Sequence, residues 1–229
     1  MPNIELLEKS LPVAPIRNAA LSGCQDLAKE VDKKLVKFRR ELVEKKQPSI
    51  IPQGYSEPSF LVECECVRFG TGEGKGYIKE SVRGADLFIM VDITNYSETY
   101  TVCGHVNHMS PDNHYQDLKR IISASTGKAH RINVIMPFLY EGRQHRRSKR
   151  ESLDCALALK ELSDMGVSNF ITFDAHDPRV QNSIPLNGFD NFFPTYQFLK
   201  ALVKNVPDFR LDNDHLMIIS PDEGAMSRA

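Results

Sequence analysis

The sequence predicts an α/β fold with a mainly parallel sheet flanked by helices. Apolar and β-branched runs alternate along the chain with amphipathic stretches, which is the order of elements in α/β proteins. One of the apolar runs, residues 87–91, has no polar side chain on either face. Strands of parallel sheets have this composition because helices cover both of their faces.

The expected elements follow from these patterns. Six strands are expected, at residues 16–21, 60–69, 86–93, 131–138, 169–173 and 215–220. Four helices are expected, at residues 25–45, 113–125, 148–165 and 195–204. In the first helix, apolar residues recur at steps of three and four with charged residues between them. Glycines predict a hairpin turn within residues 69–77, and residues 187–194 are expected to form a linker.

The length of the chain allows one large domain, or one domain and a fraction of a second. Its 229 residues suffice for one domain of ordinary size and part of another. We expect a first α/β domain at residues 1–187 and the incomplete start of a second at 188–229, since about forty residues are too few for an independent core. The sequence ends just after a predicted strand and its loop, so we expect a truncated chain.

Composition excludes several classes of protein. Lys and Arg number 29 and Asp and Glu 30, a balance that excludes a polybasic nucleic-acid-binding protein and an acidic disordered tail. No uncharged apolar run approaches the ~18 residues of a membrane span, and no signal peptide is evident. The five scattered cysteines are typical of a reducing compartment. We expect a cytoplasmic protein with neither nucleic-acid nor membrane partners.

Polar and charged residues follow four of the predicted strands. These segments are residues 92–95, 140–147, 174–177 and 220–224. Ligands of open parallel sheets bind beyond the carboxyl ends of the strands. Carboxylates with a histidine are suited to Mg²⁺, and guanidinium groups are suited to phosphates. The segments therefore suggest a nucleotide–metal site, although carboxylates after strands also cap helices.

Four motifs resemble those of ribose-phosphate pyrophosphokinases, in the same order and at the same spacing. They are ESVRGAD at 80–86, PFLYEGRQHR at 137–146, DAH at 174–176 and SPD at 220–222. The resemblance implies two phosphoribosyltransferase-like α/β domains. It also implies transfer of the diphosphoryl group of Mg-ATP to ribose 5-phosphate, which yields phosphoribosyl pyrophosphate and AMP.

The resemblance implies roles for individual residues. The ATP-binding residues would be Phe69, Glu73, Arg143, Gln144 and His176, and the metal ligands would be Asp174, His176 and Asp222. His176 would be the catalytic residue, at the ATP phosphates and Mg²⁺. Phe69 and Glu73 would lie in a loop that completes the adenine pocket of a neighbouring subunit, so a homo-oligomer is expected. The implied cofactor is Mg²⁺, and the implied substrates are ATP and ribose 5-phosphate.

The chain also departs from the family pattern. Thr71 and His145 stand where the family has carboxylates, and residues 95–112 form a longer, His-rich stretch. The two acids and Thr-Gly-rich turn of the ribose-phosphate loop are absent, so the chain by itself is expected to be inactive or nearly so. A non-catalytic nucleotide-binding or regulatory subunit of an active synthetase is the alternative.

Cysteine and histidine residues raise one further possibility. The group Cys103, His105, His108 and His114 lies in a stretch expected to be an exposed loop and would suit a zinc-dependent interaction module. Its spacing matches no common zinc finger. Cys64 and Cys66 share one face of a predicted strand and are expected to be core or edge residues.

Overall fold

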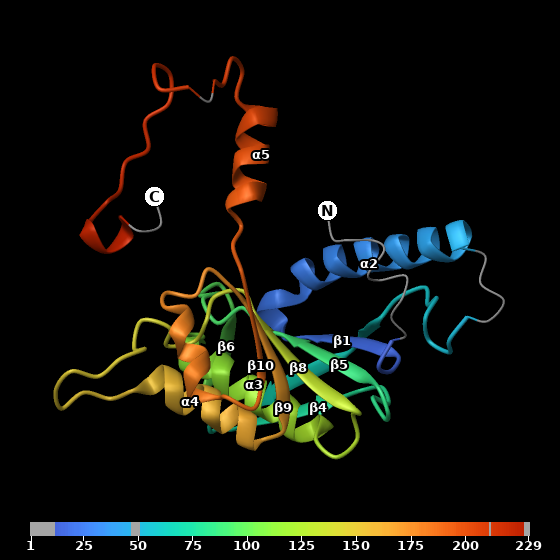
Figure 1. Cartoon of the computed structure of the whole chain (residues 1–229). Coiled ribbons are helices and arrows are strands. Elements are labelled where there is room, and N and C mark those ends of the chain that lie inside the picture. Colours follow the sequence, from blue (N-terminus) through green and yellow to red (C-terminus); the bar gives the residue numbers. More distant parts are fainter. Residues whose placement is uncertain (1–11, 47–50, 211, 227–229) are drawn as a thin grey trace. The chain divides into compact units, whose positions relative to one another are not determined.

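The computed structural model describes residues 12–46, 51–210 and 212–226. A six-stranded sheet has the order β10-β9-β8-β5-β1-β2, and every neighbouring pair of its strands is parallel (Figure 1). Its strands are β1 (Ile16–Ala20), β2 (Leu61–Val62), β5 (Asp86–Met90), β8 (Arg131–Met136), β9 (Val167–Phe173) and β10 (Gly188–Phe192). The predicted fold class is confirmed.

The helices agree with the predicted ones except at their ends. They are α2 (Gln25–Lys46), α3 (Pro111–Ser125), α4 (Asp154–Asp164) and α5 (Thr195–Asn205), with the short 3-10 helices η1 (Ser22–Cys24), η2 (Pro178–Ser183) and η3 (Glu223–Ala225). Helix α4 begins six residues later than predicted, because its buried stripe begins only at Cys155. None of the described helices is both long and apolar enough to cross a membrane.

Helices cover the two faces of the sheet unequally. α2 connects β1 to β2, the strand at one edge of the sheet. α3 lies between β5 and β8 in the chain and α4 between β8 and β9, so these connections lead toward the other edge, β10. Right-handed crossovers therefore place α2 on one face and α3 with α4 on the other (Figure 1). The larger core lies on the α3 and α4 side and includes the fully buried Leu118, Ile122 and Leu162. On the α2 side, the buried cluster contains only Cys24, Ala28 and Met90.

Two antiparallel hairpins extend the fold beyond the parallel sheet. β3 (Cys64–Arg68) pairs with β4 (Gly74–Ile78), which confirms the hairpin predicted within residues 69–77. β6 (Thr99–Val102) pairs with β7 (His105–His108), where an exposed loop was expected. Cys103 and Gly104, the two residues between β6 and β7, both have positive φ angles (50° and 83°). Two-residue hairpin turns with this conformation match the twist of the flanking strands.

The chain divides into two compact units, residues 1–192 and 193–229. β10 belongs to the first unit and pairs with β9, so the expectation of a linker at 187–194 was wrong for residues 188–192. Pairing with β9 supplies partners for the backbone of this glycine- and asparagine-containing segment, and Phe189 packs against the main core. The predicted division at residue 187 stays a prediction.

The second unit contains α5, whose side chains are exposed along its length. The strand predicted at residues 215–220 is absent. A strand needs a neighbour with which to form hydrogen bonds, and the described residues between 193 and 226 contain no other strand.

Candidate nucleotide-binding site

The loops that follow β8 and β9 meet beyond the carboxyl ends of these neighbouring strands. Nε2 of His145, in the loop after β8, lies 3.4 Å from Oδ2 of Asp177, in the loop after β9. The rings of His145 and His176 have centroids 5.2 Å apart. Two segments that are about thirty residues apart in the sequence therefore form one surface, as the parallel topology predicts.

Strand β10 holds the loop after β9 by its backbone. The Asp174 N–H donates to the Phe192 carbonyl, and the Ala175 N–H donates to Oδ1 of Asn191, each at 2.9 Å. Asp174 adopts a left-handed conformation with φ 45°, which Asp tolerates better than most residues. These contacts determine where the neighbouring His176 lies.

Asn191 is a residue of this site that the sequence analysis did not identify. Its Nδ2 atom is buried and has no hydrogen-bond partner in the described structure, so the contact through Oδ1 is the one that its carboxamide makes. The available signal was its place between Phe189 and Phe192, but residues 187–194 were interpreted as a linker. Only the pairing of β10 with β9 brings Asn191 to the loop.

Asp177 is a fixed negative charge beneath this surface. Its carboxylate accepts hydrogen bonds from the Arg179 side chain and, at 2.9 Å, from the Arg179 backbone N–H. These hydrogen bonds lower the pKa of Asp177 well below its usual range, and the charge of His145 contributes in the same direction. Asp177 is therefore ionised at neutral pH and stabilises His145 where the two loops meet.

Arg143 and Gln144 lie in a tight turn after β8. The Gln144 N–H donates to the Glu141 carbonyl at 2.8 Å, and the Gln144 carbonyl accepts from the Cys155 N–H at 3.3 Å. These bonds connect the turn to the first turn of α4. The side chains of Arg143 and Gln144 are exposed beside His145, so they are accessible to a ligand.

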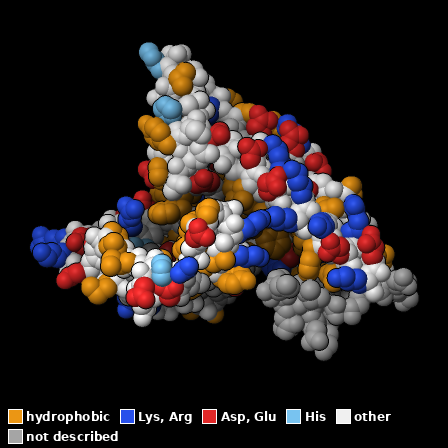
Figure 2. All heavy atoms as spheres, turned by 90° about the horizontal axis from the view of Figure 1, so that it is seen from above, with side chains coloured by type: hydrophobic (Ala, Val, Ile, Leu, Met, Phe, Trp, Pro, Cys, Tyr) orange, Lys and Arg blue, Asp and Glu red, His pale blue; other side chains and the backbone are white. Residues whose placement is uncertain are grey.

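A cationic loop continues from this turn. It contains Arg143, Arg146, Arg147, Lys149 and Arg150, all exposed. None of these side chains forms an ion pair within the described part of the chain. The loop projects from the sheet at the left of Figure 1, and Figure 2 shows a group of Lys and Arg side chains at the same end of the molecule. Exposed guanidinium groups in this arrangement are suited to phosphate oxygens.

The other predicted site residues lie elsewhere. Phe69 and Glu73 flank the β3–β4 turn, where the Phe69 N–H donates to the Glu73 carbonyl at 2.8 Å. Phe69 is 53% exposed. Asp222 belongs to the second unit, where its carboxylate accepts from the Ala225 N–H at 2.8 Å and so caps η3.

The histidines of residues 103–114 do not gather around a metal. The His114 ring is buried on α3 with Nε2 at 2.9 Å from the Asn95 carbonyl oxygen, and His108 stacks on Tyr96. Among the residues that the structure describes, no three His, Cys, Asp or Glu side chains are placed to hold a metal ion. The zinc alternative receives no support, because the hairpin directs these residues to different neighbours.

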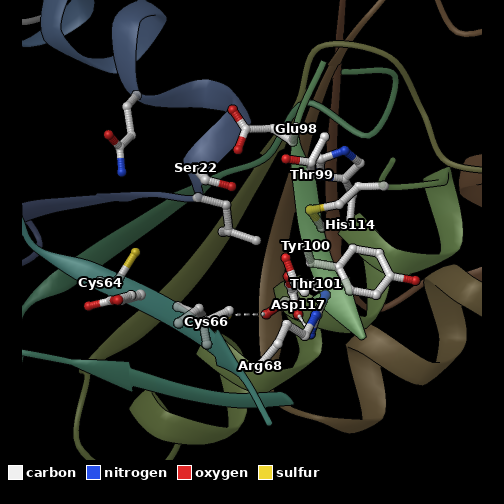
Figure 3. A pocket seen from close by; sticks show the side chains of 15 residues that line it. Ser22, Cys64, Cys66, Arg68, Glu98, Thr99, Tyr100, Thr101, His114 and Asp117 are labelled. Carbon is white, nitrogen blue, oxygen red and sulfur yellow. Dashed lines mark hydrogen bonds and ion pairs between the residues drawn. The ribbon is translucent and has the colours of Figure 1, made fainter. Parts of the chain in front are cut away.

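A cavity of about 490 Å³ lies between the β3–β4 and β6–β7 hairpins and α3 (Figure 3). Its lining includes Arg68, whose guanidinium forms two hydrogen bonds to Asp117, at 2.7 and 2.9 Å. Burial raises the pKa of Cys64 to about 11 and that of Cys66 to about 12. Both therefore remain thiols at neutral pH, and Cys64 is a core residue as expected.

Comparisons with known proteins show which family the chain resembles. The profile of the N-terminal domain of ribose phosphate pyrophosphokinase matches residues 17–166. The ribose-phosphate pyrophosphokinase of Thermosipho africanus is 31% identical over 172 residues, which are 74% of this chain and 48% of that protein. That of Oceanobacillus iheyensis is 28% identical over 171 residues, which are 74% of this chain and 47% of that protein. The chain thus spans about half the length of these curated relatives.

A solved structure has the same fold. The phosphoribosylpyrophosphate synthetase from Mycobacterium smegmatis superposes with a TM-score of 0.62 at 19% sequence identity, over 83% of this chain and 52% of that chain. Arg143 and Gln144 lie within the matched profile, whereas Asp174 and His176 follow it. With more than half of its length matched, the chain belongs to the ribose-phosphate pyrophosphokinase family through the N-terminal domain of that family.

Proposed function

We propose that this chain provides the nucleotide-binding half of a ribose-phosphate pyrophosphokinase. The reaction transfers the diphosphoryl group of ATP to the C1 hydroxyl of ribose 5-phosphate. The observation that carries the proposal is the contact between His145 and Asp177, which joins the cationic loop to the loop that contains His176. Cations and a histidine thereby share one exposed surface at the ligand-binding edge of the sheet.

The chemistry of the reaction fits such a surface. The C1 oxygen forms a bond to the β-phosphorus, the bond from that phosphorus to the α–β bridging oxygen breaks, and the hydroxyl proton is lost. Transfer of this kind depends on positioning and on neutralising phosphate charge. Arg143 would bind the nucleotide through charge-assisted hydrogen bonds, with Gln144 beside it. His176, held by the loop after β9, would contact the ATP phosphates.

Magnesium would enter this site together with ATP. Mg²⁺ usually takes one or two protein ligands and completes its octahedron with phosphate oxygens and water. Asp174 and His176 would be those ligands, so a group of three protein ligands is not required. When bound, the ion would neutralise phosphate charge. The proposed contact of Asp222 with the metal on the sugar side rests on the family resemblance alone.

The β3–β4 turn is the part of the chain that we propose to contact a neighbouring copy. The exposed Phe69 side chain is available to stack on a purine, and Glu73 is available to accept hydrogen bonds. We propose that both complete the adenine pocket of a neighbouring copy, so that the protein functions as a cytoplasmic homo-oligomer. A nucleotide-binding subunit without catalysis would use the same surface.

Calorimetry of the chain with Mg-ATP tests the proposal. Arg143→Ala should weaken Mg-ATP about tenfold, the effect of one lost hydrogen bond to a charged group. Arg150→Ala is the matched control, because it removes the same charge farther along the loop, and it should change the affinity less than about twofold. Equal losses in both variants would indicate nonspecific attraction, and absence of Mg-ATP binding to the unmodified chain would refute the proposed function for this chain.

Formation of product from ribose 5-phosphate distinguishes the two candidate functions. An active synthetase should convert ribose 5-phosphate and ATP to phosphoribosyl pyrophosphate and AMP, which phosphate-resolved NMR detects directly. Product formed by this chain would exclude the non-catalytic subunit. Because the chain by itself is expected to be inactive, Mg-ATP binding without product agrees with both functions.

A further inference from the structure

The two antiparallel hairpins of the first unit meet at their turns. The Cys103 N–H, in the β6–β7 turn, donates to the Gly70 carbonyl in the β3–β4 turn at 3.1 Å. Val102 packs against the same turn: a methyl group placed on Gly72 would come within 3.1 Å of Cγ2 of Val102. Neither contact could be expected from the sequence, where residues 103–114 were interpreted as part of an exposed loop.

The β6–β7 hairpin is itself anchored at its base. His108 stacks on Tyr96 with ring centroids 4.5 Å apart, and its Nδ1 lies 2.8 Å from the Tyr96 carbonyl oxygen. The Met109 N–H donates to the Glu98 carbonyl at 2.9 Å, which closes the hairpin where it leaves the chain. An element held at its base can restrain what its tip contacts.

The turn of the β3–β4 hairpin is closed by only a few hydrogen bonds among the described residues of that hairpin. Besides the Cys103 contact, the β3–β4 turn is closed by two backbone hydrogen bonds, from Phe69 to the Glu73 carbonyl and from Gly72 to the Phe69 carbonyl, each at 2.8 Å. Within the turn, the Thr71 hydroxyl also donates to the Glu73 carboxylate at 2.9 Å. Phe69 and Glu73 point to solvent from a turn that contains Gly70 and Gly72. Glycine increases the conformational freedom of the unrestrained chain.

We propose that the β6–β7 hairpin is a brace that positions Phe69 and Glu73 for the base of a purine nucleotide. The proposal rests on the function proposed above and adds Val102 and the hairpin to it as positioning elements. A turn held in one conformation binds more tightly than a mobile one, because less conformational entropy is lost on binding. The brace would affect contacts to the base and not those to the phosphates. Its effect can therefore be measured separately from phosphate binding.

Two variants test the brace. Val102→Ala removes the packing against Gly72, and Val106→Ala is the matched control, since Val106 lies on β7 of the same hairpin and is 69% exposed. Replacing residues 99–108 by two glycines removes the whole brace, and the Glu98–Met109 hydrogen bond shows that the remaining ends are adjacent. Circular dichroism and melting curves establish that each variant is folded.

Amide hydrogen exchange and ligand binding provide independent readouts. We expect exchange of the Gly72 and Phe69 amides to accelerate about tenfold in the excision variant and severalfold in Val102→Ala. The affinity for Mg-ATP should decrease in the same variants. The affinity for magnesium tripolyphosphate, which has no base, should not change. Samples are compared at the same oligomeric state, determined by sedimentation.

Each outcome decides a different point. Unchanged exchange at the turn in both variants would refute the brace and leave the proposed function intact. Faster exchange with unchanged Mg-ATP affinity, or equal weakening of Mg-ATP and tripolyphosphate, would refute the role in base recognition. Failure of the unmodified chain to bind Mg-ATP would refute the proposed function itself, and the nucleotide role of the brace with it.

Discussion

The two loops that meet at the candidate site are held in opposite ways. The loop after β9 is held through its backbone, by hydrogen bonds from Asp174 to Phe192 and from Ala175 to Asn191. The loop after β8 is anchored at the turn of Arg143 and Gln144, but its cationic side chains are exposed and form no ion pairs within the described residues. The fold positions the first loop, whereas a bound anion would have to order the second.

This difference has a physical reason. A group that must contact a metal or a reacting phosphate needs its position set before the ligand arrives. Exposed guanidinium groups attract phosphate through charge, and this attraction tolerates a range of side-chain positions. The contrast therefore predicts that the loop after β9 is sensitive to geometry and the loop after β8 to charge and ionic strength.

The largest effect is expected at His176. His176→Ala should weaken Mg-ATP binding about tenfold or more, because a contact with the phosphates and metal is lost. The side chain is exposed, so the melting temperature should change little. The matched control is His105→Ala, because His105 is an exposed histidine on β7. This variant should leave the affinity for Mg-ATP, measured by calorimetry, unchanged. Affinity that survives in His176→Ala would remove this residue from the site.

A smaller effect is expected when the support of that loop is removed. Asn191→Ala eliminates the acceptor of the Ala175 N–H, and exchange of that amide should accelerate about tenfold while Mg-ATP weakens a few-fold. Asn191→Asp retains an acceptor oxygen at the same place and should restore both properties.

The Asp174 amide, which donates to the Phe192 carbonyl, is the internal reference for this exchange measurement. Equal exchange at Ala175 in Asn191→Ala and the unmodified chain would show that the side chain of Asn191 does not hold the loop. Failure of Asn191→Asp to restore protection would show that an acceptor oxygen at this position is not sufficient to hold the loop.

The smallest effect is expected in the part of the cationic loop that follows Arg143. The double variant Arg146→Gln, Arg147→Gln removes two positive charges. Its affinity for Mg-ATP should fall a few-fold at low salt and hardly at all near 1 M salt, where charges are screened beyond about 3 Å. The free energy of unfolding should change by less than about 0.5 kcal/mol. The effect of Asn191→Ala should persist at both salt concentrations, and a salt-sensitive loss there would contradict the distinction between the loops.

Much of the fold could be predicted because its signals are local. The apolar run of β5 and the three- and four-residue periodicity of α2 identify these elements without knowledge of their neighbours. The hairpin at β3–β4 was predicted from its glycines. The sequence around Cys103–Gly104 also carried a hairpin signal, with β-branched and aromatic residues at 99–102 and Val106 after the turn. Its histidines directed the interpretation toward a metal site.

The errors fall where pairing between distant segments decides the structure. β10 has glycine, aspartate and asparagine in five residues, a composition typical of loops, and it becomes a strand because β9 offers an edge. Residues 215–220 have strand composition but no strand beside them in the described part of the second unit. Intrinsic strand preference is weak compared with the availability of a partner.

The sequence by itself determined the fold class, the central elements and the segments that follow β8 and β9, because periodicity and apolarity act over a few residues. The family was evident from motifs at fixed spacing. Only the tertiary structure decided that Asn191 supports Ala175, that His145 meets Asp177 and that Cys103 contacts Gly70. Each of these contacts joins residues at least sixteen positions apart. Such contacts depend on strand order and register, which no local pattern encodes.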